Sequence, residues 1–551
     1  MARNQKRIDH YRKRLKSLET ERSPFIPLWR ELSDYILGHR GRFLVTDGNK
    51  PKRNTKQHNN TAKMAARTLA SGMMAGITSP ARPWFQLGTL DPDLAEFGPA
   101  KIWLHDVEMK MREVFAQSNV YNQLHASYAE LGTFGTAPMG VYFNRENIIR
   151  AKAYTAGSYM LATNGLDEVD TFFRKYRMTV GQVVKEFGKD NVSRSCLDNW
   201  NRGNTESWVN IIHCIEPNDD ADMMSAKGTS MPYRSVYFEE NQSEDKFLRV
   251  KGFEDFPIMA PRWDIAGDDI YATSCPGMDA LGDNKALQLH EKRTSTAIDI
   301  LVDPPKQAPI AMKNMISGSF LPGDLEFVPD TGNGIKSMYD FKPDLNAMAS
   351  ISARDEDRVN KAYYVDLFLM LANSDRRQIT AREIEEKHEE KLLMLGPVLE
   401  RLHNELLNPL IKRTFNLMMQ AGVLPEPPSD LQDTALNVEY ISVLAQAQKL
   451  TAINGLERLS TYAMNLAQVW PEARHKFDAM QSIDEYAQSV GVAPRVVKDD
   501  EAAEGAIAAE RQQQQAAQMA ELAPGMAQAA KSMADTDVES ANALTRSMGL
   551  A

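Results

Sequence analysis

Two arginines in a short polar stretch are the side chains best suited to contact a phosphate. The stretch reads Asn373-Ser374-Asp375-Arg376-Arg377 and lies between two segments with a helical pattern. Paired guanidinium groups on a loop are typical phosphate contacts. A charged surface loop in front of a helix cap is the alternative that these residues leave open.

The cysteines and a neighbouring histidine are the candidates for metal chemistry. The chain has three cysteines, Cys196, Cys214 and Cys275, and His213 precedes one of them. Their spacing fits no zinc pattern, and the β-type segment around His213 favours core packing. We therefore expect free thiols of a reducing compartment and no metal site.

Acid–base chemistry has one candidate, a carboxylate cluster at 385–390, where two glutamate pairs flank a lysine and a histidine. An exposed helix face with alternating charges explains this cluster without any pocket. The sequence contains no G-x-x-x-x-G-K-[ST], H-E-x-x-H or G-x-S-x-G motif. We therefore expect no enzyme and no cofactor, although an enzyme with an unrecognised site stays open as an alternative.

The composition limits the kinds of partner. The 551 residues suffice for several domains, and the formal net charge is −10. Most of the surface should therefore repel the phosphates of DNA. No apolar run approaches the length of a membrane span, and the basic segment 1–16 lacks the apolar core of a secretory signal.

The periodicity of the chain predicts an α+β fold that is mainly α. Helical patterns cover 1–40, with Ser23 as a cap before Pro24, and also 61–74, 99–117 and 120–131. Residues 140–257 instead alternate like short strands, with one helical insertion at 179–188 and a hairpin signal at Asn164-Gly165.

The second half of the chain is predicted to be helical around one compact insert. Helical patterns at 278–301 and 345–371 flank a segment rich in Gly and Pro. A long helix follows, with a capping box at Thr380 and Glu383 and kinks expected at Pro397 and Pro409. Further helices are expected up to 498, one starting at a Ser482 capping box, before an Ala- and Gln-rich tail that is helical or disordered.

Three segments carry a resemblance to a known family. The first is Leu69-Ala70-Ser71-Gly72 leading to Thr78-Ser79-Pro80-Ala81-Arg82-Pro83-Trp84-Phe85. The second is Phe256-Pro257-Ile258-Met259-Ala260-Pro261-Arg262-Trp263, followed by Asp269-Ile270-Tyr271 and Pro276-Gly277. The third is the helix at 380–419. Their order resembles the portal, or head-to-tail connecting, proteins of short-tailed, T7-like phages. The chain departs from the family at Leu37-Gly38, where a proline is expected, which affects only the end of the first helix.

The resemblance implies a portal-type fold with long stem and wing helices, a small β-rich wing subdomain and an α/β clip. The implied parts are a wing at 1–277, β-rich at 140–257; stem helices at 278–302 and 346–371; a clip at 303–345; a tunnel loop at 372–379; a long kinked wing helix at 380–425; a crown at 426–500; and a C-terminal tail at 501–551.

The resemblance also implies a function. Such proteins form a ring, a dodecamer in the family, at one capsid vertex of the virion, after assembly in the host cytoplasm. Double-stranded DNA passes through the ring during packaging and ejection. The implied partners are the terminase large subunit, a tail adaptor protein, the major capsid and scaffolding proteins, and internal core proteins on the crown, with no membrane.

Two sets of charged residues follow from this resemblance, in addition to the tunnel loop Asn373 to Arg377. The stem channel candidates lie among acidic residues and are Lys285, Lys292, Arg293, Arg354, Arg358 and Lys361. The clip docking candidates are Lys306, Lys313, Asp324, Glu326 and Asp330. Without the resemblance, the stem charges would be read as solvated helix faces.

Another capsid-internal or scaffold protein is the structural alternative. A scaffold should be low in aromatic residues and mostly helical. The β-rich segment and the tryptophans Trp84, Trp200, Trp208 and Trp263 argue against it.

Overall fold

The computed structural model describes most of the chain, and it divides into two compact units. The described residues are 2–47, 56–89, 98–219, 221, 230–242, 246–310, 325–328, 336–337, 343–373, 395–428, 436–439, 457–468, 470, 472, 476–490, 496–497, 503 and 505–515. The first unit comprises Met1–Phe85, Met109–Pro425 and Ser442–Gln448, and the second comprises Gln86–Glu108, Glu426–Ile441 and Lys449–Ala551.

The N-terminal segment forms two helices, α1 (Ala2–Arg22) and α2 (Phe25–Tyr35). Their junction differs from the prediction, because Ser23 does not cap α2. Its hydroxyl donates to the backbone oxygen of Thr20 at 2.8 Å, and no side chain caps the start of α2 at Pro24. Ser23 thus helps to end α1.

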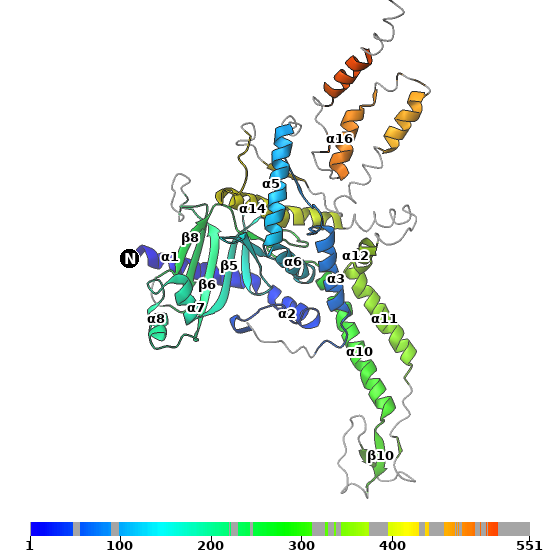
Figure 1. Cartoon of the computed structure of the whole chain (residues 1–551). Helices are drawn as coiled ribbons and strands as arrows, with labels where there is room; N and C mark the ends of the chain where they lie inside the picture. Colours follow the sequence, from blue (N-terminus) through cyan, green and yellow to red (C-terminus); the bar gives the residue numbers. More distant parts are fainter. Residues whose placement is uncertain are drawn as a thin grey trace, which may run out of the picture. The chain divides into compact units, whose positions relative to one another are not determined.

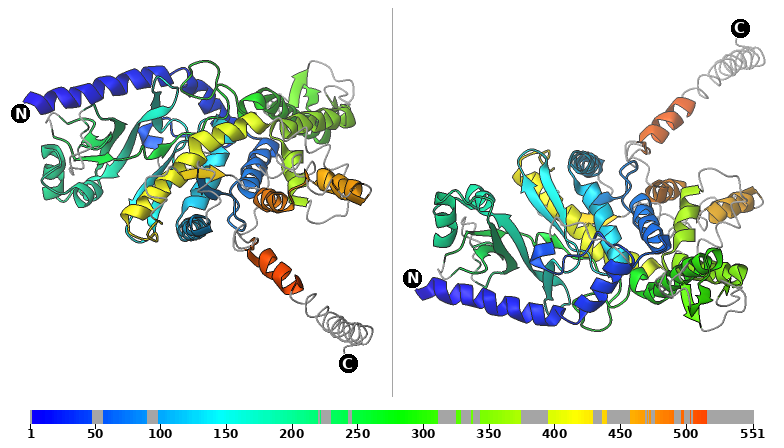
Figure 2. Two further views of the ribbon diagram at one scale, coloured as in Figure 1. Left: turned by 90° about the horizontal axis from the view of Figure 1, so that it is seen from above. Right: turned by 90° about the horizontal axis from the view of Figure 1, so that it is seen from below.

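A five-stranded antiparallel sheet is the largest β element of the first unit. Its strand order is β4 (Tyr159–Thr163), β5 (Val169–Thr179), β6 (Trp208–Pro217), β7 (Tyr233–Glu239) and β8 (Arg249–Phe253). Helix α1 runs along one face (Figure 2), where its apolar side chains Ile8, Tyr11, Leu15 and Leu18 join those of the strands in one core. The amphipathic spacing of α1 provides this contact.

The opposite face is covered in part by two short helices, where the sequence predicted one. Helix α7 (Val180–Phe187) starts with the capping box of Thr179 and Gln182. Helix α8 (Arg194–Asn201) starts at Ser193, whose hydroxyl accepts a hydrogen bond from the backbone of Cys196. Both helices pack on Ile211 of the sheet.

The predicted hairpin between β4 and β5 is present, with a longer loop than a two-residue Asn-Gly turn. The Asn164 side-chain oxygen accepts from the backbone nitrogens of Leu166 and Glu168 at 2.8 and 3.0 Å. Asp167, not Gly165, takes the positive φ, at 59°. Side-chain bonding by Asn to its own backbone produces such Asx turns.

Helices α3 (Thr61–Gly76) and α6 (Val120–Phe134) form the centre of the first unit. They approach closely because Gly132 leaves room for Leu69, which a Cβ at Gly132 would meet at 2.1 Å. A small sheet of β2 (Met139–Asn144), β3 (Ile148–Ala153) and β9 (Ile258–Met259) extends from α6.

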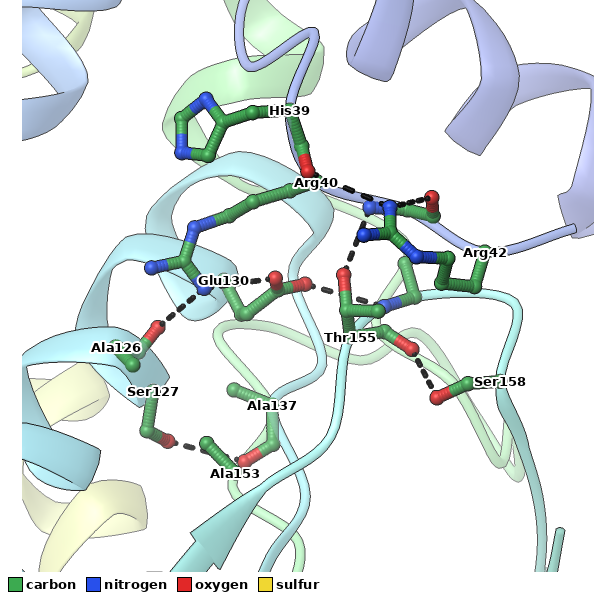
Figure 3. Close-up of polar contacts among 12 residues, drawn as sticks. His39, Arg40, Arg42, Ala126, Ser127, Glu130, Ala137, Ala153, Thr155 and Ser158 are labelled. Carbon is green, nitrogen blue, oxygen red and sulfur yellow. Dashed lines mark hydrogen bonds and ion pairs between the residues drawn. The ribbon is translucent and has the colours of Figure 1, made fainter. Parts of the chain in front are cut away.

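One buried ion pair fastens the loop after α2 to this centre (Figure 3). Glu130 on α6 is 1% exposed, and its Oε1 lies 3.0 Å from Nη1 of Arg40. Its other oxygen accepts from the backbone nitrogen of Ala156 at 3.1 Å. The backbone nitrogen of Gly41 donates to the Thr155 hydroxyl beside it. Both of these side-chain contacts of Glu130 thus join segments that are distant in sequence.

The long helix predicted at 380–425 is described from residue 395 onward, so the capping box at Thr380 lies outside the described residues. Helical residues 395–402 continue through a π turn, η4 (His403–Leu407), into α14 (Asn408–Gln420). The π turn immediately precedes Pro409, whose missing N–H disrupts the regular hydrogen-bond ladder. Glu405 in this turn binds buried Arg262 through Nε at 3.0 Å and Nη2 at 2.6 Å.

The second unit contains a two-stranded antiparallel sheet of β1 (Gln86–Thr89) and β13 (Leu436–Glu439). Residues 457–468 and 505–515 are helical, and so is α16 (Ala479–Val490). The cap of α16 is Asp478, which accepts from Met480 and Gln481. The predicted cap, Ser482, instead lies within the helix and donates to Ala479. Helix α5 (Gly98–Gln117) has residues in both units, and the short η1 (Val45–Asp47) belongs to the first. The class is mainly α, α+β, as predicted.

Removing the charge of Glu130 tests the importance of the Arg40 contact. We expect Glu130→Gln to lower the free energy of unfolding by about 3 kcal/mol, because it leaves a partly buried guanidinium without its counter-ion. Urea denaturation followed by tryptophan fluorescence measures this change.

The control is Glu31→Gln, which breaks the exposed pair of Glu31 with Lys285. That variant should change stability by no more than about 0.5 kcal/mol. Equal unfolding curves for the two variants would contradict the structural role of the Arg40–Glu130 pair.

Candidate functional site

A pair of helices at the end of the first unit contains most of the candidate channel residues. Helices α10 (Leu281–Val302) and α11 (Leu345–Ala362) lie side by side (Figure 1). The short helix α9 (Pro276–Asp279) leads into α10, and Asp344 caps α11 by accepting from the backbone nitrogens of Asn346 and Ala347. Buried residues spaced three and four apart, Ser352, Asp355 and Val359, form the inner face of α11.

Two buried amides on α10 anchor this helix pair to the unit. The Gln288 side-chain oxygen accepts from the backbone nitrogens of His58 and Asn59 at 2.6 and 2.8 Å. Its nitrogen donates to the Asn59 carbonyl and to the Asn284 side chain, both at 3.0 Å. Asn284 in turn donates to the carbonyl of Tyr35 at the end of α2. These amide groups are thereby satisfied in a site that excludes water.

Carboxylates of α11 complete the anchor. Glu356 accepts from the side chains of Asn59 and Thr61 at 2.7 and 3.3 Å. Asp355, only 2% exposed, is 2.8 Å from Nδ1 of His290 on α10 and 3.3 Å from Nη2 of Arg354. The sequence analysis did not select Asn284 or Gln288. The feature of the sequence that could have indicated them is a pair of polar residues, four apart, on the same helix face as the apolar Leu281.

Four of the six stem channel candidates are paired with carboxylates of the same chain. Lys285 lies 2.6 Å from Glu31, Arg358 lies 3.4 Å from Asp283, Lys361 lies 2.6 Å from Asp357, and Arg354 contacts Asp355. The hydrogen bond to Asp357 raises the pKa of Lys361.

The remaining two candidates, Lys292 and Arg293, are exposed, and neither side chain forms an ion pair within the described part of the chain. The six residues therefore do not converge on one basic site. The helix pair presents mixed charges instead, as the sequence suggested.

Two of the candidate docking residues, Lys306 and Glu326, lie on short strands beyond the far end of this helix pair. Three short strands occur there, with β10 (Lys306–Pro309) between β11 (Leu325–Val328), which is parallel to it, and β12 (Lys336–Ser337), which is antiparallel. Lys306 pairs with Asp303 at 2.9 Å, and Glu326 is in register with Gln307. Lys313, Asp324 and Asp330 lie outside the described residues.

The predicted single helix at 345–371 is interrupted before the candidate DNA-contact loop. Helix α11 ends at Ala362, Tyr364 takes a φ of 54°, and α12 (Val365–Asn373) follows. Phe368 of α12 fits against Gly72 of α3, where a Cβ would approach it to 2.2 Å. Asn373 is the last residue of α12, and Ser374, Asp375, Arg376 and Arg377 lie outside the described residues.

The cysteines lie in three separate environments. Cys214 is buried between the sheet and α1, Cys196 is a buried residue of α8, and Cys275 donates to the Thr133 carbonyl at 3.4 Å. Burial raises the pKa of Cys196 to about 11, so its thiol stays protonated at neutral pH. Among the residues with described positions, no cluster of three or more His, Cys, Asp or Glu side chains is suited to hold a metal ion. The helices of the same residues include none with the length and apolar character of a membrane span.

Comparison with known proteins identifies one family over most of the chain. The family model described as bacteriophage head to tail connecting protein matches residues 8–497. The portal protein of Salmonella phage epsilon15 is 46% identical over 536 residues, covering 97% of this chain and 96% of that protein. The probable portal protein of Bordetella phage BPP-1 is 42% identical over 534 residues, covering 96% and 95%. The chain therefore belongs to the family of bacteriophage head to tail connecting proteins.

Proposed function

We propose that the protein is the portal of a phage particle, a closed ring at one capsid vertex through which double-stranded DNA is packaged and ejected. The names of its two relatives support this reading. In the ring, a dodecamer by analogy with the family, identical head-to-tail contacts between copies close on themselves.

The observation that carries this proposal is the apolar surface at the far half of the helix pair, toward β10. Large apolar side chains there are exposed on both helices: Ile298, Leu301 and Val302 on α10, and Leu345 and Ile351 on α11. Two helices cannot enclose apolar residues that point away from their shared interface. An exposed apolar surface of this kind is typical of a contact between proteins, and neighbouring copies in a ring would cover it.

The charges of the helix pair suit a channel that DNA must pass without being held. Each cation that binds a phosphate releases counter-ions and adds affinity. Intramolecular pairing of Lys285, Arg354, Arg358 and Lys361 reduces the positive charge available for such contacts. Of this set, only Lys292 and Arg293 form no ion pair within the described part of the chain.

The segments then take the following roles. Residues 278–302 and 346–371 form the stem, 303–345 the clip, 372–379 the tunnel loop at the bore, and 426–500 the crown inside the capsid. Residues 1–277 and the kinked helix 380–425 form the wing. The tail at 501–551 adds helices to the crown or fringes it.

The partners follow from this arrangement. The clip docks the terminase large subunit during packaging and the tail adaptor protein afterwards, the wing meets the major capsid and scaffolding proteins, and the crown meets internal core proteins. The ring assembles in the host cytoplasm and remains in the virion, and it acts without catalysis.

Charged substitutions at the exposed apolar surface should prevent ring closure. Ile298 is 42% exposed and Val302 is 78% exposed, so Ile298→Asp with Val302→Asp should leave the fold intact. Mass photometry and negative-stain imaging should show discrete rings for the natural protein and smaller species for this variant. The matched control is Leu166→Asp at a hairpin residue that is 79% exposed, which should still form rings. Rings in both variants would contradict the assigned interface.

The tunnel-loop arginines should act in DNA passage and not in assembly. Arg376→Ala with Arg377→Ala should leave the ring population unchanged and reduce the DNA packaged per particle, because phosphate contacts are lost. The corresponding double lysine variant keeps both charges and should retain most packaging. Failure of the alanine variant to form rings would show a structural role, and unchanged packaging would contradict the loop assignment.

Docking at the clip is tested with Lys306 and Glu326. Their joint replacement by alanine should weaken retention of the tail adaptor protein in pull-downs by about tenfold, while rings still form, because charge-assisted contacts are removed. Lys13→Ala on the exposed side of α1 is the control. If the tail adaptor protein is retained as well as by the control, the docking surface does not include β10 and β11.

A further inference from the structure

The face of the five-stranded sheet opposite α1 bears a cation surrounded by aromatic rings. Side chains alternate along β5, so Phe173 joins the core with α1 and the next residue, Arg174, points to the opposite face. The guanidinium carbon of Arg174 lies 4.2 Å from the centre of the Tyr176 ring and 5.3 Å from that of Tyr154. Its Nε donates to Nδ1 of His213 at 3.2 Å.

A second cation lies beside it on β3. The ammonium of Lys152 is 5.6 Å from the centre of the same Tyr154 ring, and the hydroxyls of Tyr154 and Tyr142 are 2.9 Å apart. The Lys152 side chain is only partly exposed. Its partial burial is the main cause, and the charge of Arg174 the second cause, that lowers its pKa to about 8.

Neither cation has a carboxylate partner in the described part of the chain. Lys152 forms no ion pair there, and the two terminal nitrogens of Arg174 donate no hydrogen bond. Glu186, the carboxylate that acts on Lys152, is 3.1 Å from Arg249 and thus already engaged.

On the face of the sheet that packs against α1, a lysine is paired with carboxylates. Lys175, which follows Arg174, lies 2.6 Å from Glu19 and 2.9 Å from Glu240. Lys175 thus has two carboxylate partners, whereas Lys152 and Arg174 have none in the described part of the chain. The surface formed by Lys152, Tyr154, Arg174 and Tyr176 is here called the Arg174 surface. It leaves a place for an anion from outside the chain.

We propose that the Arg174 surface binds a carboxylate side chain from an acidic segment of a partner protein. The terminal nitrogens of an arginine form a fork that matches a carboxylate in two parallel hydrogen bonds. Tyrosine and arginine together are also the residue types enriched at the centres of protein interfaces.

The charges favour an acidic polypeptide over DNA. A DNA-binding face presents many cations along the phosphate backbone, whereas the Arg174 surface has two unpaired ones set between tyrosines. The chain as a whole carries a formal charge of −10, which opposes an extended polyanion more strongly than a single carboxylate. This inference does not depend on ring formation, since all residues of the surface lie in one chain.

The test uses the full-length protein and a fluorescein-labelled hexaglutamate peptide, with anisotropy as the readout at low salt. Lys152→Gln removes one cation at the surface, and Arg174→Lys keeps the charge while removing the fork. Each should weaken peptide binding by about tenfold, the loss expected for one charge-assisted contact. The melting temperature of each variant shows whether its fold is retained.

The matched control is Lys189→Gln in the same part of the chain. Lys189 is also exposed and also lies 5.6 Å from the centre of an aromatic ring, that of Trp200. Among the described residues, no second cation lies over that ring. Its replacement should leave peptide affinity unchanged.

Three results would overturn the proposal. The first is that the natural protein does not bind the peptide. The second is that Lys152→Gln and Lys189→Gln reduce peptide affinity equally. The third is that Lys152→Gln reduces affinity for a labelled 20-base-pair DNA duplex more than affinity for the peptide. The last result would assign the surface to nucleic acid instead.

Discussion

The buried amide of Gln288 determines where the α10–α11 helix pair leaves the body of the first unit. One side chain satisfies two backbone donors of the segment at 58–59, one carbonyl and the Asn284 side chain. A neutral amide suits this position, because an unpaired charge there would have a large desolvation cost. Any shift of α10 along its axis would break several of these hydrogen bonds together, so the network fixes the register of the helix pair.

The two halves of the helix pair differ because of this anchor. Near Gln288, the helices are held by polar contacts with α2, with residues 56–61 and with each other. Toward β10, the same helices expose leucine, isoleucine and valine side chains that nothing in the described chain covers. A rigid inner half and an apolar outer half are what a subunit needs if its neighbours complete the packing. The intramolecular ion pairs fit the same scheme, since exposed pairs add little stability but limit the net charge presented to DNA.

Local features were predicted from the sequence more reliably than distant contacts. The capping box of Thr179 and Gln182 depends on four consecutive residues, and it forms as expected. Ser23 and Ser482 have the right residue type for a cap, but Pro24 and Asp478 occupy the cap positions. The break at Tyr364 has no local signal, and the helix that follows it packs Phe368 against Gly72 on another helix, a contact that neither segment reveals by itself. Lys285 could be chosen as a charged residue of α10, yet its pairing with Glu31, 254 residues away, could not be read from either segment.

The central claim is that neighbouring copies cover the outer half of the α10–α11 pair. The three natural cysteines are all buried, so a single introduced thiol can report on its own surroundings. The most direct measurement is the rate of maleimide labelling of Val302→Cys in the assembled protein, compared with Leu166→Cys. The account predicts slow labelling at position 302 and fast labelling at position 166. Equally fast labelling at both positions in assembled particles would contradict it.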